Sequence, residues 1–213
     1  MKVLALNCGS ATVKFQLVEI DPDSSSYSRD RKLAGGLIDG IGDQAKCRFG
    51  AAGEPSGGKL IPVGDLAGAV RAVIEWLDSV PALRRPDAVG HRVVHGGPRY
   101  TAATLIDEAV LADLDGLCEI APLHNPATVS AIHAARQALG VAMPMVAVFD
   151  TAFHHTIPAA AATYALPWEM TQRHDIRRYG FHGLAYQYDV ARYAELVGKH
   201  RVAVNVVILH LGN

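Results

Sequence analysis

The stretch Met1–Phe15, MKVLALNCGSATVKF, decides the fold of the N-terminal part of this chain. Its apolar residues Val3–Leu6 predict a buried strand, a turn of small residues follows around Gly9, and a second apolar run begins at Val13. A strand, a tight turn and a returning strand form a hairpin whose backbone N–H groups can face an anion. The alternative is an ordinary hairpin with a glycine turn, and this stretch alone supports both interpretations equally.

Four polar side chains lie at or beside this turn. Asn7 can hold a hydrated cation, while Ser10 and Thr12 offer hydroxyl groups. Lys14 supplies a point charge that suits a phosphate group. A phosphate-binding turn is therefore one hypothesis for this hairpin, and the rest of the chain has to decide it.

Size and composition are typical of a soluble globular protein. The 213 residues are 50% hydrophobic and 19% charged, and the formal net charge is -1. This balance excludes the charge pattern of proteins that bind nucleic acids or membrane surfaces. Cys8, Cys47 and Cys118 match neither a disulfide framework nor a zinc motif, which indicates a reducing compartment. Without a leader pattern or an apolar run long enough to cross a bilayer, we expect a cytoplasmic protein.

Helical and strand patterns alternate after the opening hairpin, which predicts a mixed α/β sheet with flanking helices. Helices are expected over 65–80 with Asp65 as N-cap, over 125–140 with Asn125 as cap, and from 184 to 198. The glycine-rich residues 30–50 should continue the sheet, and short buried strands are expected at 88–94 and 145–149. Residues 151–183 show little periodicity and are rich in His, Arg and Tyr, so we expect a functional segment there.

The last apolar run, Val202–Leu209, predicts one more strand, which ends in His210-Leu211-Gly212-Asn213. This ending echoes the first strand and its turn: an apolar strand, a polar residue, an apolar one, a glycine and a small polar one. A repeat this far apart in the sequence indicates two related lobes rather than a solenoid.

The strand at 88–94 carries a candidate for binding a carboxylate. Side chains alternate along a strand, so Arg92 and Val94 share one face, and His91, Val93 and His95 share the other. A guanidinium beside an apolar residue suits a small carboxylate with an alkyl tail. The more frequent role of a lone Arg is a structural ion pair. We interpret His91 and His95 as core or supporting histidines, because no metal-binding motif accompanies them.

Two further candidates lie where secondary structure begins or ends. His124 comes just before the helix expected at Asn125, where it can donate to a phosphoryl group or be a plain loop residue. Asp150 follows the strand at 145–149, and ligands of open α/β sheets bind beyond the carboxyl ends of strands. Asp150 is thus a candidate for orienting a substrate or a metal-bound water, and a turn or helix cap is the alternative.

The densest motif is RRYGFHG, from Arg177 to Gly183. Gly180 and Gly183 permit close backbone approach, and a helix is expected directly afterwards. His182 at the start of that helix suits the stabilisation of charge on a transferring phosphoryl group. Phe181 could close an apolar pocket, although exposed aromatic and arginine side chains are common in loops.

The chain resembles the acetate kinase family of acyl-phosphate-forming kinases over its whole length, because six motifs occur in the family's order and approximate spacing: NCGSATVKF, GHRVVHGG, APLHNP, VFDTAFH, RRYGFHG and HLGN. The resemblance implies an actin-like ATPase fold of two related lobes, each with a ribonuclease-H-like core. We expect residues 1–150 to form the N-terminal lobe, and residues 151–213 to hold an active-site segment and the first strand of an incomplete second lobe.

The resemblance also implies a reaction. The γ-phosphoryl group of ATP would pass reversibly and in line to a short carboxylate, forming acetyl phosphate and ADP, with Mg²⁺ as cofactor and ATP as co-substrate. Acetate is the expected acceptor, and propionate is the alternative. The family forms homodimers, and no nucleic-acid or membrane partner is expected.

The resemblance assigns roles to residues at matching motif positions. The metal would be held by Asn7. The catalytic residues would be Asp150 as the active-site carboxylate, His182 as the group that stabilises the transition state, and His124 as its assistant. The carboxylate and its alkyl group would be bound by Arg92, Val94, Leu123 and Phe181. The nucleotide phosphates would lie against Lys14, Ser10, Thr12, His210, Leu211, Gly212 and Asn213.

Two departures accompany the resemblance. The family usually has three serines where this chain has Ser10-Ala11-Thr12, and it has Thr-Ser-His where this chain has Leu184-Ala185-Tyr186. Family members also continue well beyond the HLGN motif, into the part that carries most of the adenosine site, a second transition-state arginine and an acidic magnesium ligand.

We therefore expect a truncated member whose 213 residues are weakly active or inactive alone. The alternatives are a non-enzymatic lobe that binds a carboxylate or phosphate or acts as a partner subunit, and an actin-like sugar kinase, which would need a more polar pocket.

Overall fold

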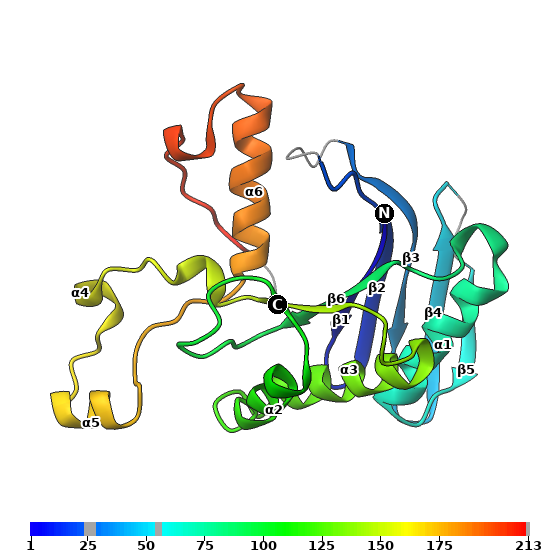
Figure 1. The fold of residues 1–213 in the computed structure, drawn as a ribbon, viewed down its shortest axis with the longest axis horizontal. Coiled ribbons are helices and arrows are strands. Elements are labelled where there is room, and N and C mark those ends of the chain that lie inside the picture. Colours follow the sequence, from blue (N-terminus) through cyan, green and yellow to red (C-terminus); the bar gives the residue numbers. More distant parts are fainter. Residues whose placement is uncertain (24–28, 54–56, 212–213) are drawn as a thin grey trace. The chain divides into compact units, whose positions relative to one another are not determined.

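The fold divides into two compact units, seen in a computed structural model that describes residues 1–23, 29–53 and 57–211 (Figure 1). The first unit comprises Met1–Val93 and Ala103–Val148, and the second comprises Val94–Ala102 and Phe149–Asn213. Each unit is described here by itself.

The first unit is built on a mixed sheet with the strand order β5-β4-β3-β2-β1-β6-β8-β7. The strands β1 to β5 form an antiparallel meander, β6 pairs with β1 in parallel, and β7 pairs with β8 antiparallel. The bounds are β1 Lys2–Cys8, β2 Thr12–Glu19, β3 Arg31–Asp39, β4 Gln44–Ala51, β5 Gly58–Pro62, β6 Ala88–Val93, β7 Thr104–Leu105 and β8 Met145–Phe149.

The hairpin expected at the N-terminus is confirmed. Burial alternates along both strands, with Leu4 and Leu6 buried in β1 and Val13 and Phe15 buried in β2. The rings of Phe15, Phe49 and Trp76 pack together, with centroid distances of 5.2 to 5.8 Å. One face of the hairpin is therefore fixed in an aromatic core, so the polar residues of the other face have defined positions.

The described part of the first unit contains the short 3₁₀ helix η2 (Pro81–Leu83) and three α-helices, of which α1 (Leu66–Ser79) and α3 (Asn125–Leu139) pack against each other and against the sheet (Figure 1). The expected start of α1 is confirmed, because the Asp65 side chain accepts a hydrogen bond of 2.6 Å from the Gly68 backbone N–H. The third helix, α2 (Glu108–Gly116), begins in the same way, at the N-cap Asp107.

The start of α3 differs from the expectation. His124 occupies the N-cap position, and Asn125 is already helical and buried. The Asn125 side chain donates to the carbonyl oxygen of Leu117 at 3.4 Å, so it is turned towards the preceding segment and cannot cap its own helix. The prediction of Asn125 as the cap was wrong, while the predicted extent of the helix is confirmed up to its C-cap, Gly140.

The second unit is mostly helical, and its elements are short apart from α6. Its helices are η3 Ala152–His154, α4 Ala159–Ala162, α5 Trp168–Arg173, α6 Gly183–Leu196 and η4 Arg201–Ala203. The rings of Tyr100 and Phe149 stack at 5.0 Å, and Gly96 lies against Phe149 so closely that an added Cβ would come within 2.8 Å of the ring. Glycine is required there because the unit's central contact leaves no room for a side chain.

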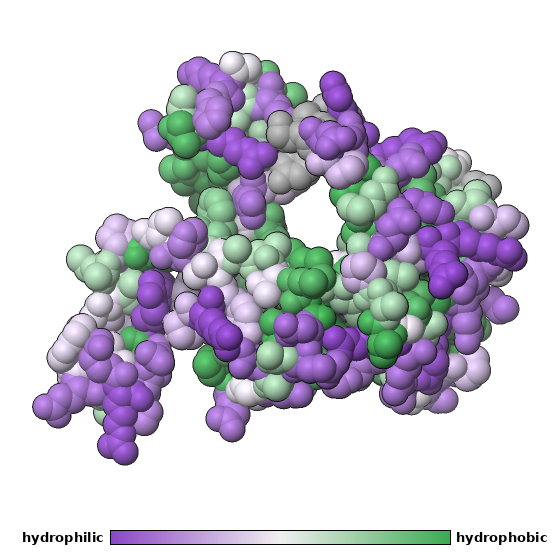
Figure 2. Space-filling view, viewed as in Figure 1, coloured by the Kyte–Doolittle hydropathy of each residue, from purple (hydrophilic) through white to green (hydrophobic). Residues whose placement is uncertain are grey.

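The strand predicted at Val202–Leu209 was wrong. The short helix η4 covers Arg201–Ala203, and residues 204–211 are neither helix nor strand. A strand needs a hydrogen-bonded neighbour, and no strand in the described part of the chain pairs with this segment. Val207 and Leu209 are 89% and 75% exposed, and Figure 2 shows hydrophobic surface along this segment beside α6.

No helix within the described ranges is both long and apolar enough to cross a bilayer.

Candidate functional site

The turn between β1 and β2 is tied to its neighbours by backbone hydrogen bonds. The Gly9 N–H donates to the Thr12 carbonyl at 2.8 Å, and the Ala11 carbonyl accepts from the N–H groups of Gly40 and Ile41, both at 3.1 Å. Ser10 is exposed at the tip of the turn. The turn thus has a fixed backbone and presents a hydroxyl group to solvent, as a phosphate-binding turn requires.

Asn7 and Lys14 face each other across this hairpin. They are register partners of the antiparallel pair, and the Lys14 side chain is exposed while Asn7 is half-buried. An amide oxygen and an ammonium group therefore occupy neighbouring positions at the same end of the hairpin as Ser10.

Arg92 is joined to this group through the parallel pairing of β6 with β1. Its Nη1 donates a hydrogen bond of 3.0 Å to Oδ1 of Asn7. From the other side, the Thr128 hydroxyl in the second turn of α3 donates to the Arg92 carbonyl at 3.1 Å. The hydrogen bond to the Asn7 amide helps to hold the half-buried guanidinium in place, and a planar guanidinium suits the binding of a carboxylate. Nothing in the sequence pattern marks Thr128, because its partner lies 36 residues away.

The histidines that flank Arg92 are buried and neutral. Burial lowers the pKa of His91 to about 4, and its Nε2 has no hydrogen-bond partner among the described residues. Burial also lowers the pKa of His95, whose Nδ1 accepts from the Gly97 N–H at 2.9 Å, so the ring proton resides on Nε2. Their interpretation as core histidines is confirmed.

The described residues contain no cluster of three or more His, Cys, Asp or Glu side chains that could hold a metal ion.

His124 and Leu123 precede α3 as exposed side chains. Leu123 is 79% exposed, and the His124 side chain makes no capping hydrogen bond although it occupies the N-cap position. Both side chains are open to a ligand, and the first unit alone does not enclose Leu123 in a pocket.

In the second unit, Asp150 and the start of α6 are locked together. Asp150 follows β8 and is 1% exposed, and its carbonyl oxygen accepts from the Gly183 N–H at 2.9 Å. A Cβ on Gly183 would lie 2.2 Å from that oxygen, so only glycine permits this contact. His182, the N-cap of α6, adopts the left-handed conformation with φ 57° and ψ 20°. The hydrogen bond between Gly183 and Asp150 therefore holds the buried Asp150 close to His182, whose backbone conformation is strained.

Aromatic contacts surround His182. Its ring stacks on the ring of His210 with centroids 4.5 Å apart, and the neighbouring Phe181 ring lies 5.8 Å from His95. The Nε2 of His154 lies 3.0 Å from the Phe181 carbonyl, which can only accept, so that nitrogen carries the proton. His154 was not among the expected functional residues, and its support of the loop before His182 has no sequence signal.

The remaining expected residues are less constrained. Val94 is half-buried and Phe181 is 46% exposed, while Leu211 is exposed. Gly212 and Asn213 lie outside the described residues. The structure thus brings together Asn7, Lys14 and Arg92 in the first unit, and Asp150, Phe181, His182 and His210 in the second.

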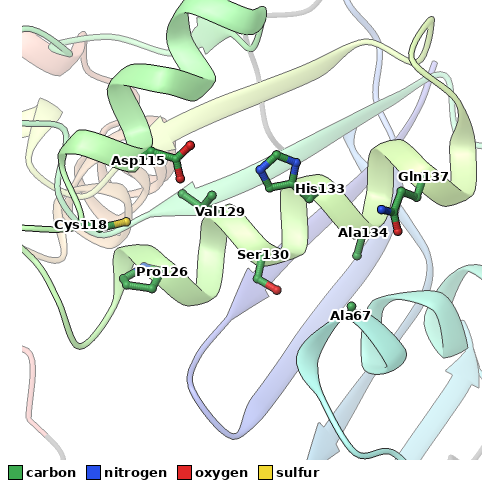
Figure 3. A pocket seen from close by; sticks show the side chains of 9 residues that line it. All are labelled: Ala67, Asp115, Cys118, Pro126, Val129, Ser130, His133, Ala134 and Gln137. Atoms are coloured by element: carbon green, nitrogen blue, oxygen red, sulfur yellow. The ribbon is translucent and has the colours of Figure 1, made fainter.

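A hollow in the first unit contains none of these residues. About 500 Å³ in volume, it lies between α1, α2 and α3, with Asp115, Cys118, Ser130 and His133 in its lining (Figure 3). Burial, and to a lesser extent the nearby Asp115 carboxylate, raises the pKa of the Cys118 thiol, which makes it a poor nucleophile. The hollow therefore adds no chemistry to the candidate site.

Comparisons with known proteins agree with the geometry. The model of the Acetokinase family matches residues 2–213. The acetate kinase of Chloroherpeton thalassium is 43% identical to this chain, over 100% of the chain and 54% of that protein. A propionate kinase from Francisella tularensis has a similar structure (TM-score 0.82, 37% identity, 93% of this chain and 49% of that chain). Porphyromonas gingivalis acetate kinase also has a TM-score of 0.82, with 32% identity over 94% of this chain and 50% of that chain.

These matches fix both the family and the extent of the likeness. The chain spans about half the length of the curated relatives it matches. The similar structures confirm the expected fold class, a mixed sheet with flanking helices as in an actin-like ATPase lobe. The chain belongs to the acetokinase family.

Proposed function

We propose that this chain provides the carboxylate-binding part and the first phosphate-binding turn of a kinase that transfers the γ-phosphoryl group of ATP to a short carboxylate. The observation that carries the proposal is the hydrogen bond between Arg92 and Asn7, because it joins a carboxylate-binding guanidinium to a turn suited to phosphate. Acetyl phosphate and ADP would be the products when acetate is the acceptor.

Arg92 would grip both oxygens of the carboxylate, which fixes the attacking oxygen for an in-line reaction. Val94, Leu123 and Phe181 would face the alkyl group, since all three are apolar and at least partly accessible. One methylene in such a pocket changes binding by only about 1–3 kcal/mol, so acetate and propionate are both candidate acceptors.

Asp150 would orient the substrate rather than remove a proton. The carboxylate acceptor is already ionised at neutral pH, so the reaction needs no general base. His182, held at the start of α6 beside His210, would stabilise charge on the transferring group, and His124 would assist as a donor at the start of α3. Lys14, Ser10 and Thr12, together with His210 and Leu211, would contact the nucleotide phosphates. The same role is proposed for Gly212 and Asn213.

Magnesium fits this donor set as an ion that arrives with the nucleotide. Mg²⁺ usually keeps several waters and takes only one or two protein oxygens besides the phosphates. Asn7 Oδ1 has two lone pairs, and Arg92 uses one of them, so one acceptor position remains for the ion or its water. When bound, the ion would neutralise charge on the β- and γ-phosphates.

We further propose that residues 1–213 alone support little or no turnover, since they correspond to about half of the relatives' length. An arginine supplied to phosphoryl transfer is worth about 10³-fold or more, and the resemblance to the family implies a second transition-state arginine beyond the matched half. We also propose a cytoplasmic location and a homodimer for the whole protein, the latter to be tested by light scattering on a full-length fusion.

The decisive experiment uses hydroxylamine to trap acyl phosphate. The 213-residue chain is assayed alone and fused to the remaining half of the Chloroherpeton thalassium acetate kinase, with acetate and with propionate. We expect activity only in the fusion, and we expect Arg92→Ala to abolish it while the exposed Arg99→Gln leaves it unchanged. An active lone chain would refute the proposed dependence on a second half, and a fully active Arg92→Ala fusion would refute the role of Arg92.

A second candidate function is binding without catalysis. The specific observation in its favour is that Asn7, Lys14 and Arg92 are assembled within the first unit alone. Calorimetric titration of the 213-residue chain with acetate tests it: binding that disappears in Arg92→Ala, together with an inactive fusion, would favour this function over the kinase.

A further inference from the structure

The second unit contains a hollow of about 140 Å³ that the proposed kinase chemistry does not use. We call it the Arg177 hollow. Its polar lining includes Thr151, His154, His155, Arg177 and Tyr179, and none of its lining residues is acidic. A hollow with a guanidinium and hydroxyl groups but no carboxylate is suited to an anion.

Arg177 is the group that most needs a ligand there. Its Nε is buried and has no hydrogen-bond partner among the described residues. The guanidinium carbon lies 5.6 Å from the centroid of the Tyr179 ring, which orients the group without satisfying its N–H donors. A buried donor without an acceptor destabilises the fold, so an oxyanion that accepts from this guanidinium would remove that cost.

The two histidines add acceptors beside these donors. His154 Nε2 faces the Phe181 carbonyl at 3.0 Å and His155 Nδ1 faces the Ala152 carbonyl at 2.8 Å. Carbonyl oxygens only accept, so both of these nitrogens carry protons, and the second ring nitrogen of each histidine is the position that can accept from a ligand. Phosphate at neutral pH has oxygens that accept from arginine and a P–OH group that donates to imidazole. Sulfate offers only acceptors.

Size and charge restrict the ligand further. Sites for drug-sized molecules usually occupy about 300–1,000 Å³, so the Arg177 hollow is suited to a compact ion. An adjoining hollow of about 340 Å³ shares Arg177 and Tyr179, and its lining includes the carboxylate of Asp175. The negative charge therefore lies outside the smaller hollow, while the larger one has room for the rest of a phosphorylated molecule.

We propose that the Arg177 hollow binds a phosphate-type oxyanion. The Arg177 guanidinium and the Thr151 hydroxyl donate hydrogen bonds to its oxygens, and its P–OH group donates to a ring nitrogen of His154 or His155. The ligand is either free phosphate or the terminal phosphoryl group of a small metabolite. The residues of this site all belong to the second unit and differ from those of the proposed phosphate-binding turn, and the proposal does not depend on the proposed kinase activity.

The test is a titration of the ¹⁵N-labelled 213-residue chain with inorganic phosphate, followed by amide NMR. We expect saturable shifts of the Gly97 and Thr151 amides, and weaker shifts with sulfate. The shifts should persist in Lys14→Gln, which removes the charge of the first-unit turn. A parallel titration with glycerol phosphate distinguishes the two possible ligands. Tighter binding of this phosphate ester would indicate a phosphorylated metabolite, and tighter binding of inorganic phosphate would indicate the free ion.

Arg177→Gln should weaken phosphate binding at these amides by at least about tenfold. The matched control is Arg173→Gln, which removes the same charge from an exposed position that lines neither hollow and should change binding by less than about twofold. If Arg177→Gln does not fold, Arg177→Lys serves as the second variant. It keeps the positive charge but lacks the planar guanidinium with its several N–H donors, so it is expected to bind phosphate more weakly than the parent chain. Unchanged binding in a folded Arg177 variant, or shifts confined to residues 9–14, would overturn the proposal.

Discussion

The guanidinium of Arg92 and the amide of Asn7 are linked by a 3.0 Å hydrogen bond between the neighbouring parallel strands β6 and β1. The two residues are 85 positions apart in the sequence, and neither is fully buried. In the proposed reaction, Arg92 binds the carboxylate and Asn7 acts on the phosphate side. The hydrogen bond between them therefore couples the orientation of the carboxylate to the position of the phosphate group.

Replacing Asn7 should weaken carboxylate binding through Arg92. A hydrogen bond to a charged group contributes about 1.5–3 kcal/mol, so Asn7→Ala should raise the dissociation constant for acetate by roughly 10- to 100-fold. Calorimetric titration of the 213-residue chain measures this effect. Ser10→Ala is the control, because Ser10 is exposed at the same turn and should leave acetate affinity unchanged. Equal affinities of the Asn7→Ala and parent chains would show that Arg92 is positioned without Asn7.

Acid should destabilise the first unit through His91. Its pKa is lowered by burial from 6.5 to about 4, so below pH 6.5 the unfolded chain binds a proton that the folded chain does not. The free energy of unfolding should therefore be highest above about pH 6.5 and fall by roughly 3 kcal/mol as the pH drops to about 4. Urea unfolding at a series of pH values measures this slope.

The control for this pH dependence is His91→Phe, which keeps an aromatic ring in the core and removes the titrating group. The lowered pKa of His95 gives a slope of the same sign, so the difference between the parent chain and the variant isolates His91. Identical pH slopes of the unfolding free energy in the parent chain and in His91→Phe would mean that His91 takes up its proton at the same pH in the folded and unfolded chains.

Gly183→Ala should displace the start of α6. The new Cβ would lie 2.2 Å from the Asp150 carbonyl, and overpacking of this kind costs about 1–3 kcal/mol. Thermal unfolding should show a lower midpoint, and the active fusion should lose kcat because His182 and Asp150 move apart. Gly116→Ala is the matched control, since no atom lies within 4 Å of the Cβ position on Gly116. A variant at Gly183 as stable as that control would contradict the close contact.

The exposed segment of residues 204–211 should make the 213-residue chain associate. Val207 and Leu209 present apolar side chains on a backbone without strand partners, which is the condition for edge-to-edge pairing. Light scattering should show a mass that rises with concentration, and Val207→Lys should reduce it. Leu196→Lys, at an exposed position of α6 outside this segment, should have a smaller effect. A monomer at all concentrations would rule out this association.

The parts of the fold that were predictable are those that local sequence determines. Asp65 before an amphipathic run gives the start of α1, and Gly9 between two apolar runs gives the hairpin. The cap of α3 was mispredicted because the Asn125 side chain hydrogen-bonds to Leu117, a contact that the helix pattern does not contain. The strand at Val202–Leu209 was mispredicted because pairing depends on a neighbour and not on β propensity.

The candidate site shows the same division. Arg92, Asp150 and His182 could be named as candidate site residues from the sequence, because polar side chains at strand ends and helix starts are placed where ligands bind. Their supports were not recognisable, because Thr128 and His154 act through contacts that only the folded chain creates. The empty hydrogen-bonding capacity of Arg177 Nε is likewise a property of packing.

The register of β1 restricts where insertions and deletions can be accepted. One residue added between Lys2 and Val3, with the start of the strand kept in place, would rotate Asn7 to the opposite face of the sheet, away from both Arg92 and the position opposite Lys14. It would also turn Leu4 and Leu6 out of the core. Changes of length that preserve function therefore have to occur in connections such as the one between α3 and β8, while the first strand has a fixed number of residues.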